Sequence, residues 1–257
     1  MLKLSVVIIT LNEEKNLGRC LQSVREIADE IVIADSGSTD NTFAIAEAYG
    51  ARVVIQPFLG YVAQKNFATD LAVNDWVLNL DADEVLSAAL IKSIRNIKES
   101  DTVAYTVSRL TNYCGSWIRH SGWYPDVKIR LYNRKKGSWR GEQIHEYWQA
   151  DHQEGATGAL KGPLYHYSYH SISDHLKQIE KFSEILARRA VAAGKESGIL
   201  KVVFAPVWKF ITSYFIRLGI LDGYPGFLVC RLSAFATFVK YSKIRQYAGK
   251  KKRGEAY

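Results

Sequence analysis

Over roughly the first 100 residues of this 257-residue chain, apolar runs alternate with segments whose apolar residues recur at helical spacing. Runs dominated by apolar and β-branched residues, without regular polar alternation, predict strands buried on both faces, as in a parallel sheet. Four such runs cover residues 4–10, 30–35, 52–56 and 76–80. After the first run, Asn12 is expected to cap a helix whose apolar side chains recur at helical spacing. Strands and helices that alternate in this way predict an α/β domain with a parallel sheet.

Helix signals also follow the later runs. Asp40 is expected to cap a helix that ends at Gly50, and Ser87 to cap another after the fourth strand. A further helix is expected over about 61–73. These signals complete the alternating half of the chain.

The alternation stops after residue 100. The segments "TVAYTVSRL", "KIRLYNR" and "LYHYSY" have strand character and no helix between them. This part is therefore expected to be antiparallel and rich in loops, and a helix over 173–193 is expected to follow it.

Residues 199–246 are rich in large apolar side chains but do not form a clean membrane-spanning segment. Lys209 and Arg217 interrupt the first apolar stretch, and Arg231 interrupts the second. A spanning helix needs about 20 apolar residues, and a charge near the bilayer centre is costly. Helices with apolar faces that lie in the membrane interface are the favoured interpretation. A helical pair packed on the rest of the chain is the alternative.

The charge distribution supports a membrane partner. The composition, 47% hydrophobic and 23% charged, is that of a globular protein. Residues 184–257 hold 14 basic and 4 acidic side chains, so that the positive charge is concentrated there. Such a segment is attracted to an anionic membrane surface. Nucleic acid is not expected as a partner, because no recognition motif accompanies the basic tail.

Polar side chains cluster where three of the predicted strands end. Thr10, Asn12 and Glu13 follow the first strand, the segment 35–40 follows the second, and 81–84 follows the fourth. Each cluster alone is compatible with a helix cap or a turn. Since ligands of open parallel sheets bind beyond the carboxyl ends of the strands, the three together indicate a ligand site.

The third cluster has the chemistry of a metal site. Asp81 and Asp83 are two positions apart, which in an extended segment places both carboxylates on one face, about 6–7 Å apart. Hard oxygen ligands suit Mg²⁺ or Mn²⁺, whose other positions are commonly filled by water and phosphate. Neither the glycine-rich dinucleotide fingerprint nor the P-loop motif is present, so a diphosphate here is expected to depend on the metal.

Four segments resemble the donor-binding half of family 2 inverting glycosyltransferases, which have the GT-A fold. They are "SVVIITLNEE", "VIADSGSTDNT", "AQKNFA" and "LNLDADE", in the expected order over residues 4–87. The later segments "SGWYPDVKIRLYNR", "WRGEQIHEYW", "LYHYSYHS" and "LDGYPGFL" are similar to the bacterial branch that adds a sugar, typically β-linked glucose, to the lipopolysaccharide inner core. The resemblance implies a mixed GT-A sheet with a C-terminal helical extension.

The resemblance also implies roles for individual residues in binding a UDP-sugar. Those expected to contact the nucleoside, the diphosphate or the sugar are Thr10, Asn12, Glu13, Asp35, Ser36, Lys65, Asn66 and Asp81. Asp83 is expected to bind the metal, with Asp81 beside it and His166 as a third contact. For His166 the alternative is a core histidine between two tyrosines.

An inverting displacement needs a base near the acceptor hydroxyl, and the second half of the chain offers several. The candidates are Glu142, His145, Glu146 and Asp126. Glu146 is preferred, because aromatic residues flank the His-Glu pair. Trp139, Tyr147 and Trp148 are expected to stack against a sugar, and Arg140 to hold an acidic group of the acceptor. A solvated hairpin edge is the alternative interpretation of this segment.

Together these patterns predict a catalytic domain over residues 1–195 and a membrane-associating region over 196–257. Residues 1–100 would hold the nucleotide-sugar and 101–195 the acceptor. The predicted reaction moves a hexose from a UDP-sugar to a membrane glycolipid at the cytoplasmic face of the bacterial inner membrane. A non-catalytic membrane adaptor and a nucleotidyltransferase are the alternatives.

Overall fold

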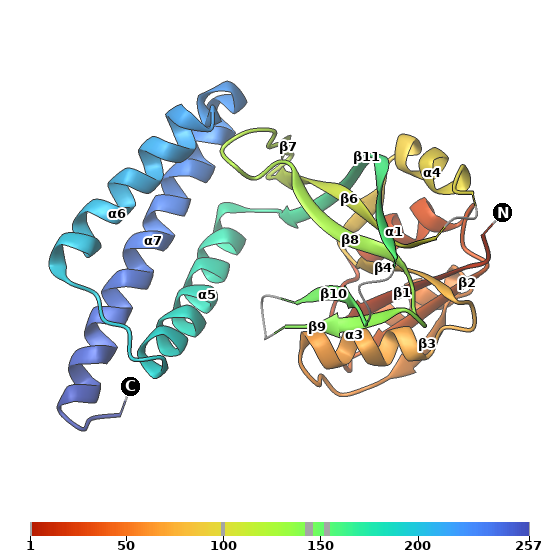
Figure 1. Ribbon diagram of the computed structural model, residues 1–257, viewed down its shortest axis with the longest axis horizontal. Helices are drawn as coiled ribbons and strands as arrows, with labels where there is room; N and C mark the ends of the chain where they lie inside the picture. The colour runs from red at the N-terminus through yellow and green to blue at the C-terminus, as the bar shows by residue number, and fades with distance from the viewer. Residues whose placement is uncertain (1, 99–100, 142–145, 152–154, 257) are drawn as a thin grey trace. The chain divides into compact units, whose positions relative to one another are not determined.

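The computed structural model describes residues 2–98, 101–141, 146–151 and 155–256. Its main sheet has the strand order β3-β2-β1-β4-β8-β6-β11-β5, with β7 paired to β6 (Figure 1). The strands of this sheet are β1 (Leu4–Thr10), β2 (Glu30–Asp35), β3 (Arg52–Ile55), β4 (Trp76–Asp81), β5 (Glu84–Leu86), β6 (Thr102–Tyr113), β7 (Ser116–Trp117), β8 (Asp126–Asn133) and β11 (Ala156–Tyr169). The short strands β9 (Gly137–Arg140) and β10 (Tyr147–Ala150) form a separate ribbon.

The first half of the sheet is parallel, as predicted. β1 pairs in parallel with β2 and β4, and β2 pairs in parallel with β3. The helices between them are α1 (Leu17–Val24), α2 (Thr42–Ala48), α3 (Tyr61–Asp70) and α4 (Ala88–Arg95). The central strands are buried on both faces, which explains why their runs are mainly apolar.

One predicted helix cap is wrong and another is confirmed. Helix α1 begins at Leu17, whereas Asn12 lies in a loop with a φ of 56° and its side chain accepts a hydrogen bond from the Thr39 N–H. Asn12 therefore fixes one loop to another. Ser87 caps α4, because its hydroxyl accepts a hydrogen bond from the Leu90 N–H.

The second half of the sheet is antiparallel where its pairing is defined. β8 pairs in this way with β4 and β6, and β11 with β5. The change of direction brings the acidic end of β4 beside β8, a strand that carries alternating basic side chains. The GT-A type of mixed α/β sheet expected from the sequence is confirmed.

The chain divides into two compact units. The first holds the residues up to Leu110 together with Asp126–Tyr167, and the second holds Thr111–Pro125 together with the chain from Ser168 onward. In the second unit α5 (Ile172–Ala192) packs against α7 (Gly223–Lys252). The predicted functional boundary near residue 195 stays a prediction.

Between α5 and α7 the second unit contains a nearly continuous apolar helix. It consists of α6 (Ile199–Ile211) and a π-helical turn, η1 (Thr212–Ile216), and a 3₁₀ turn, η2 (Gly219–Asp222), leads into α7. In the described part of the chain, Ile199–Ile216 is the one stretch long and apolar enough to cross a membrane, with a mean hydropathy of 1.5 over 18 residues. It passes this test of length and composition despite Lys209.

Candidate functional site

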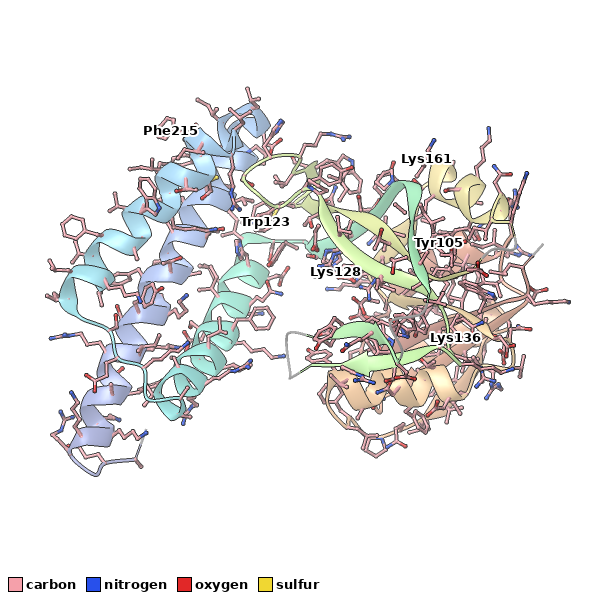
Figure 2. All side chains as sticks on the ribbon, in the orientation of Figure 1. Tyr105, Trp123, Lys128, Lys136, Lys161 and Phe215 are labelled. Atoms are coloured by element: carbon pink, nitrogen blue, oxygen red, sulfur yellow. The ribbon has the colours of Figure 1, made fainter. Side chains whose placement is uncertain are left out.

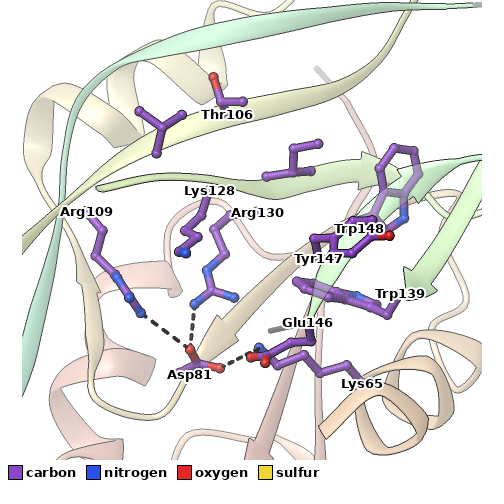
Figure 3. Close-up of a pocket in the computed structure, with 12 residues that line it drawn as sticks. Lys65, Asp81, Thr106, Arg109, Lys128, Arg130, Trp139, Glu146, Tyr147 and Trp148 are labelled. Carbon is purple, nitrogen blue, oxygen red and sulfur yellow. Dashed lines mark hydrogen bonds and ion pairs between the residues drawn. The ribbon is translucent and has the colours of Figure 1, made fainter. Parts of the chain in front are cut away.

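A cavity of about 460 Å³ opens in the first unit at the carboxyl end of β4. It is bounded by α3, by β4, by the sheet strands β6 and β8, and by the β9–β10 ribbon (Figure 3). Its lining residues are Lys65, Asp81, Thr106, Arg109, Val127, Lys128, Ile129, Arg130, Trp139, Glu146, Tyr147 and Trp148. Charged side chains from four elements therefore converge on one pocket.

Asp81 is surrounded by three cations of the protein itself. Its carboxylate lies 2.5 Å from Arg130, 3.1 Å from Lys65 and 3.9 Å from Arg109. Burial raises the pKa of Asp81, but these positive charges outweigh burial and hold the pKa well below its usual range. Much of the compensation that the acidic cluster requires is thus supplied by side chains.

Glu84 is a buried partner in this network that was not assigned a role from the sequence. Its side chain is fully buried, and its carboxylate lies 2.6 Å from Arg130 and 3.3 Å from Arg109. It also accepts a hydrogen bond of 3.0 Å from the backbone N–H of Asp81. Glu84 therefore fixes the backbone and the cations that hold the Asp81 carboxylate.

Lys65 connects Asp81 to the preferred base. It projects from α3, is almost fully buried, and lies 3.3 Å from the carboxylate of Glu146. Its ammonium group also lies 4.6 Å from the ring centre of Trp139. The structure thus brings together three predicted site residues, Lys65, Asp81 and Glu146, on one wall of the pocket.

The aromatic residues of the ribbon are used differently from the prediction. Trp139 and Trp148 are each only 4% exposed and pack on Tyr132, and the Trp139 indole N–H donates to the Tyr132 hydroxyl. Most of each indole ring is buried in the hydrophobic core, so Trp139 and Trp148 are poorly placed to stack on a sugar. Tyr147 is 54% exposed and lines the pocket. Asn66 bonds the backbone of Trp139 through both ends of its amide, so it holds the ribbon in place.

The other base candidates are less favourably placed. Asp126 lies 2.6 Å from Arg109 and 3.3 Å from Lys128. Burial raises the pKa of Asp126, but the two cations outweigh burial and lower the pKa overall, which weakens Asp126 as a base. Glu142, with His145, lies outside the described residues.

The structure does not bring Arg140 to the pocket. Its guanidinium group is half exposed and lies 2.8 Å from Asp151. It does not belong to the cavity lining. The predicted contact of Arg140 with the acceptor is therefore not supported by its position.

The loops after β1 and β2 form a second cluster around Asp35. Its carboxylate accepts from the hydroxyls of Thr10 and Ser38 and from the N–H groups of Gly37 and Ser38, each within 2.8 Å. Asp35 is fully buried, so the group expected to recognise a uracil ring is engaged inside the protein. A uracil ring could bond to the Asp35 carboxylate only after the hydroxyl of Thr10 or Ser38 reorients.

Ser36, Asn12 and Glu13 surround this cluster. The Ser36 hydroxyl accepts a bond of 3.3 Å from Gln64. The Asn12 N–H donates to Ser38, and burial raises the pKa of Glu13. Side-chain hydrogen bonds tie these loops together beyond the carboxyl ends of β1 and β2, and their role in binding a nucleoside stays a prediction.

Asp83 and His166 form a separate pair beside the Asp81 network. The two side chains approach to 3.1 Å, and His166 remains partly exposed rather than enclosed in the core. Burial raises the pKa of Asp83, but the neighbouring His166 lowers it overall. The pair unites two of the predicted metal contacts.

The donor set fits a magnesium or manganese ion that is shared with a diphosphate. No group of three or more His, Cys, Asp and Glu ligands occurs in the described residues. Mg²⁺ in phosphate-binding sites needs only one or two protein ligands, since phosphate and water fill its remaining positions. Asp83 and His166 meet that requirement, whereas Asp81 is engaged by three cations.

Comparisons with known proteins place this geometry in a family. The sequence model of "Glycosyl transferase family 2" matches residues 5–151, more than half of the chain. An uncharacterized glycosyltransferase of Rickettsia typhi is 36% identical over 96% of this chain and 88% of its own length. The lipopolysaccharide core biosynthesis glycosyltransferase LpsC of Rhizobium meliloti is 33% identical over 95% of this chain and 93% of its own length.

Solved structures give a looser match. Glucosyl-3-phosphoglycerate synthase of Mycobacterium tuberculosis, solved with Mn²⁺ and UDP, is 25% identical over 44% of each chain, with a TM-score of 0.36. TarS of S. aureus, solved with UDP-GlcNAc, is 16% identical over all of this chain and 93% of that chain, with a TM-score of 0.46.

Proposed function

The chain belongs to glycosyl transferase family 2 and is a glycosyltransferase, and we propose that it moves a hexose, glucose in the first instance, from a UDP-sugar to a hydroxyl of a membrane glycolipid. The observation that carries this proposal is the Asp81–Lys65–Glu146 series in the pocket at the end of β4. The similarity to a lipopolysaccharide core enzyme supports the core glycolipid as the acceptor.

The donor would lie along the carboxyl edge of the parallel strands. The nucleoside would contact the loops that carry Thr10, Asn12 and Ser36, with Asp35 behind them. Asp83 and His166 would hold Mg²⁺ or Mn²⁺. When bound, the metal would offset the negative charge that develops on the departing UDP.

Glu146 would act as the base. It lines the pocket, where an acceptor hydroxyl would lie, and a carboxylate there can accept the hydroxyl proton as the oxygen attacks the anomeric carbon. Lys65 holds Glu146 next to Asp81 and so places the base beside the sugar-binding carboxylate. Attack from the side opposite the leaving UDP inverts the anomeric centre.

The acceptor would be met at the membrane. The second unit carries the apolar helix α6, a candidate span by length and composition, and the chain from residue 184 onward carries 14 basic residues. These features support peripheral attachment to the cytoplasmic face of a bacterial inner membrane, where UDP-sugars are available.

Calorimetry of nucleotide binding tests the donor assignment. UDP should bind in the presence of Mn²⁺, and binding should weaken at least about tenfold when the metal is removed, since the diphosphate contacts the protein chiefly through the metal. ADP and GDP serve as controls for the uracil site and should bind more weakly. Equal binding of the three nucleotides would contradict a UDP-sugar donor.

A further inference from the structure

Helix α6 leaves one whole side unpaired within the second unit. Its exposed apolar side chains recur at helical spacing along its length, so they share one face. We call this face the α6 surface; it consists of Leu200, Val203, Phe204, Val207, Trp208 and Ile211. Phe215, in the π-helical turn that follows, extends the exposed apolar side chains beyond α6 and projects away from the helices (Figure 2).

The charged side chains of α6 lie on another side. Val202 is buried, and Lys209, seven residues further on, shares its face and is partly buried. The Lys201 ammonium lies 4.9 Å from the ring centre of Tyr241 on α7. The six side chains of the α6 surface are all apolar, and the two lysines of the helix are accounted for by the contact of Lys201 with Tyr241 and the partial burial of Lys209.

Such a surface has the composition of a membrane-facing one. Apolar patches larger than a few hundred Å² are rare on soluble monomers and mark interaction sites. We propose that the α6 surface lies in the plane of the membrane and enters one leaflet of the bilayer without crossing it. This inference rests on the proposed function, since it supplies the way in which the enzyme reaches a lipid-linked acceptor.

The C-terminal end of α6 is tied to the aqueous side. Asp222, eleven positions after the last residue of α6 and directly before α7, accepts hydrogen bonds from the backbone of Arg119 and His120 and lies 2.8 Å from the His120 ring. Asp126, whose carboxylate pairs with Arg109 in the pocket, lies only six positions after His120. Six residues reach at most about 21 Å, less than the roughly 30 Å of a hydrocarbon core.

The N-terminal end of α6 is on the same side. It follows α5, a helix that carries seven charged residues between Asp174 and Arg189 and so does not enter a bilayer. Glu196, in the connection between the two helices, pairs with Lys252 at 2.7 Å. Helix α6 is long enough to span a bilayer together with the turn that follows it. Because both of its ends are held on the same aqueous side, it does not cross.

Electrostatic attraction is the smaller part of this binding. Lys243 is paired with Glu180 and Glu184, and Lys252 with Glu196. These pairs reduce the charge that the basic C-terminal helix offers to anionic lipid. High salt should therefore weaken binding only modestly, because apolar contacts are not screened.

Vesicle flotation of the full chain tests the α6 surface. The variant carries Phe204→Asp and Trp208→Asp, at positions that are 62% and 64% exposed. The control carries Ile55→Asp and Val73→Asp, which are 65% and 69% exposed on the first unit and change the net charge equally. With vesicles of phosphatidylethanolamine and phosphatidylglycerol, the unsubstituted chain and the control should float, and the α6 variant should bind at least about tenfold less.

Equal flotation of the two variants would overturn the proposal, as would resistance of the bound protein to alkaline carbonate. Should the α6 variant fail to fold, tryptophan fluorescence replaces flotation. The part of the fluorescence that is due to Trp208 is identified by its loss in Trp208→Phe. Lipids brominated near the headgroup should quench this part, and no quenching would overturn the proposal. Transfer to a deacylated, water-soluble core acceptor should be equal in both variants. If no acceptor is used yet the chain floats, the proposed function fails and the membrane surface stands.

Discussion

The ammonium group of Lys65 lies 3.3 Å from the carboxylate of Glu146, a residue 81 positions further along the chain. The same group lies 3.1 Å from Asp81. One buried lysine therefore bridges the carboxylate at the end of β4 and the carboxylate directly before β10. This arrangement couples sugar binding to the base in the proposed mechanism.

Glu146→Gln should lower turnover by about 100-fold or more, the usual scale for losing a general base. UDP affinity should stay nearly unchanged, because the amide keeps the size of the side chain. Initial rates at saturating donor and calorimetry with UDP measure the two effects. Asp126→Asn is the matched control, and a dead Asp126→Asn beside an active Glu146→Gln would move the base to Asp126.

Asp83→Asn should remove the metal dependence of UDP binding. The amide cannot supply an anionic oxygen to Mn²⁺ and leaves His166 without its charged partner. The expected result is UDP binding that is weak with or without Mn²⁺, in a chain with an unchanged thermal midpoint. Metal-enhanced binding in this variant would show that other residues hold the ion.

Arg130→Met should destabilise the fold by about 3–5 kcal/mol, the scale for breaking a buried ion pair from one side. Arg130 is buried between Asp81 and Glu84, and its loss leaves Glu84 without its nearest cation. Urea unfolding measures the change. Arg52→Met, which breaks the more exposed pair with Glu30, should cost only about 0–1 kcal/mol. Equal losses would contradict the buried network.

The stability supplied by Asp81 should depend on pH in one direction. Its pKa in the folded chain lies well below the value of about 3.9 for an unfolded aspartate. Its ionised form therefore stabilises the fold above about pH 4, and this contribution is lost as the pH falls through the folded pKa. Unfolding free energies of the unsubstituted chain and Asp81→Asn should thus converge on acidification. A difference that stays constant at low pH would refute the assignment.

The parallel half of the fold was predictable because its strands are buried on both faces. Residues 4–10 and 30–35 were predicted at the bounds that the structure has, since apolar and β-branched residues dominate both runs. Asn12 was misplaced because its residue type suits a helix cap and an exposed loop equally well. Only the contact with Thr39, far along the chain, decides between the two.

The site residues that lie in sequence motifs could be predicted, whereas those that reach the site from distant strands could not. Asp81, Asp83 and Lys65 stand in motifs that the family resemblance covers. Arg109 and Arg130 alternate with apolar residues in antiparallel strands, a pattern that also fits solvent-exposed side chains. Their burial depends on carboxylates 17 to 49 positions away, so the sequence alone contained no local signal for it.

Transfer of sugar to core glycolipid is the measurement that tests the central claim most directly. The purified chain is incubated with Mn²⁺, a core glycolipid acceptor and a panel of UDP-sugars, and the products are followed by mass spectrometry and proton NMR. The account predicts that one UDP-hexose loses its sugar to the lipid with release of UDP, that the new linkage is β, and that Glu146→Gln abolishes the product. Release of pyrophosphate, an α linkage, or no transfer from any UDP-sugar would contradict it.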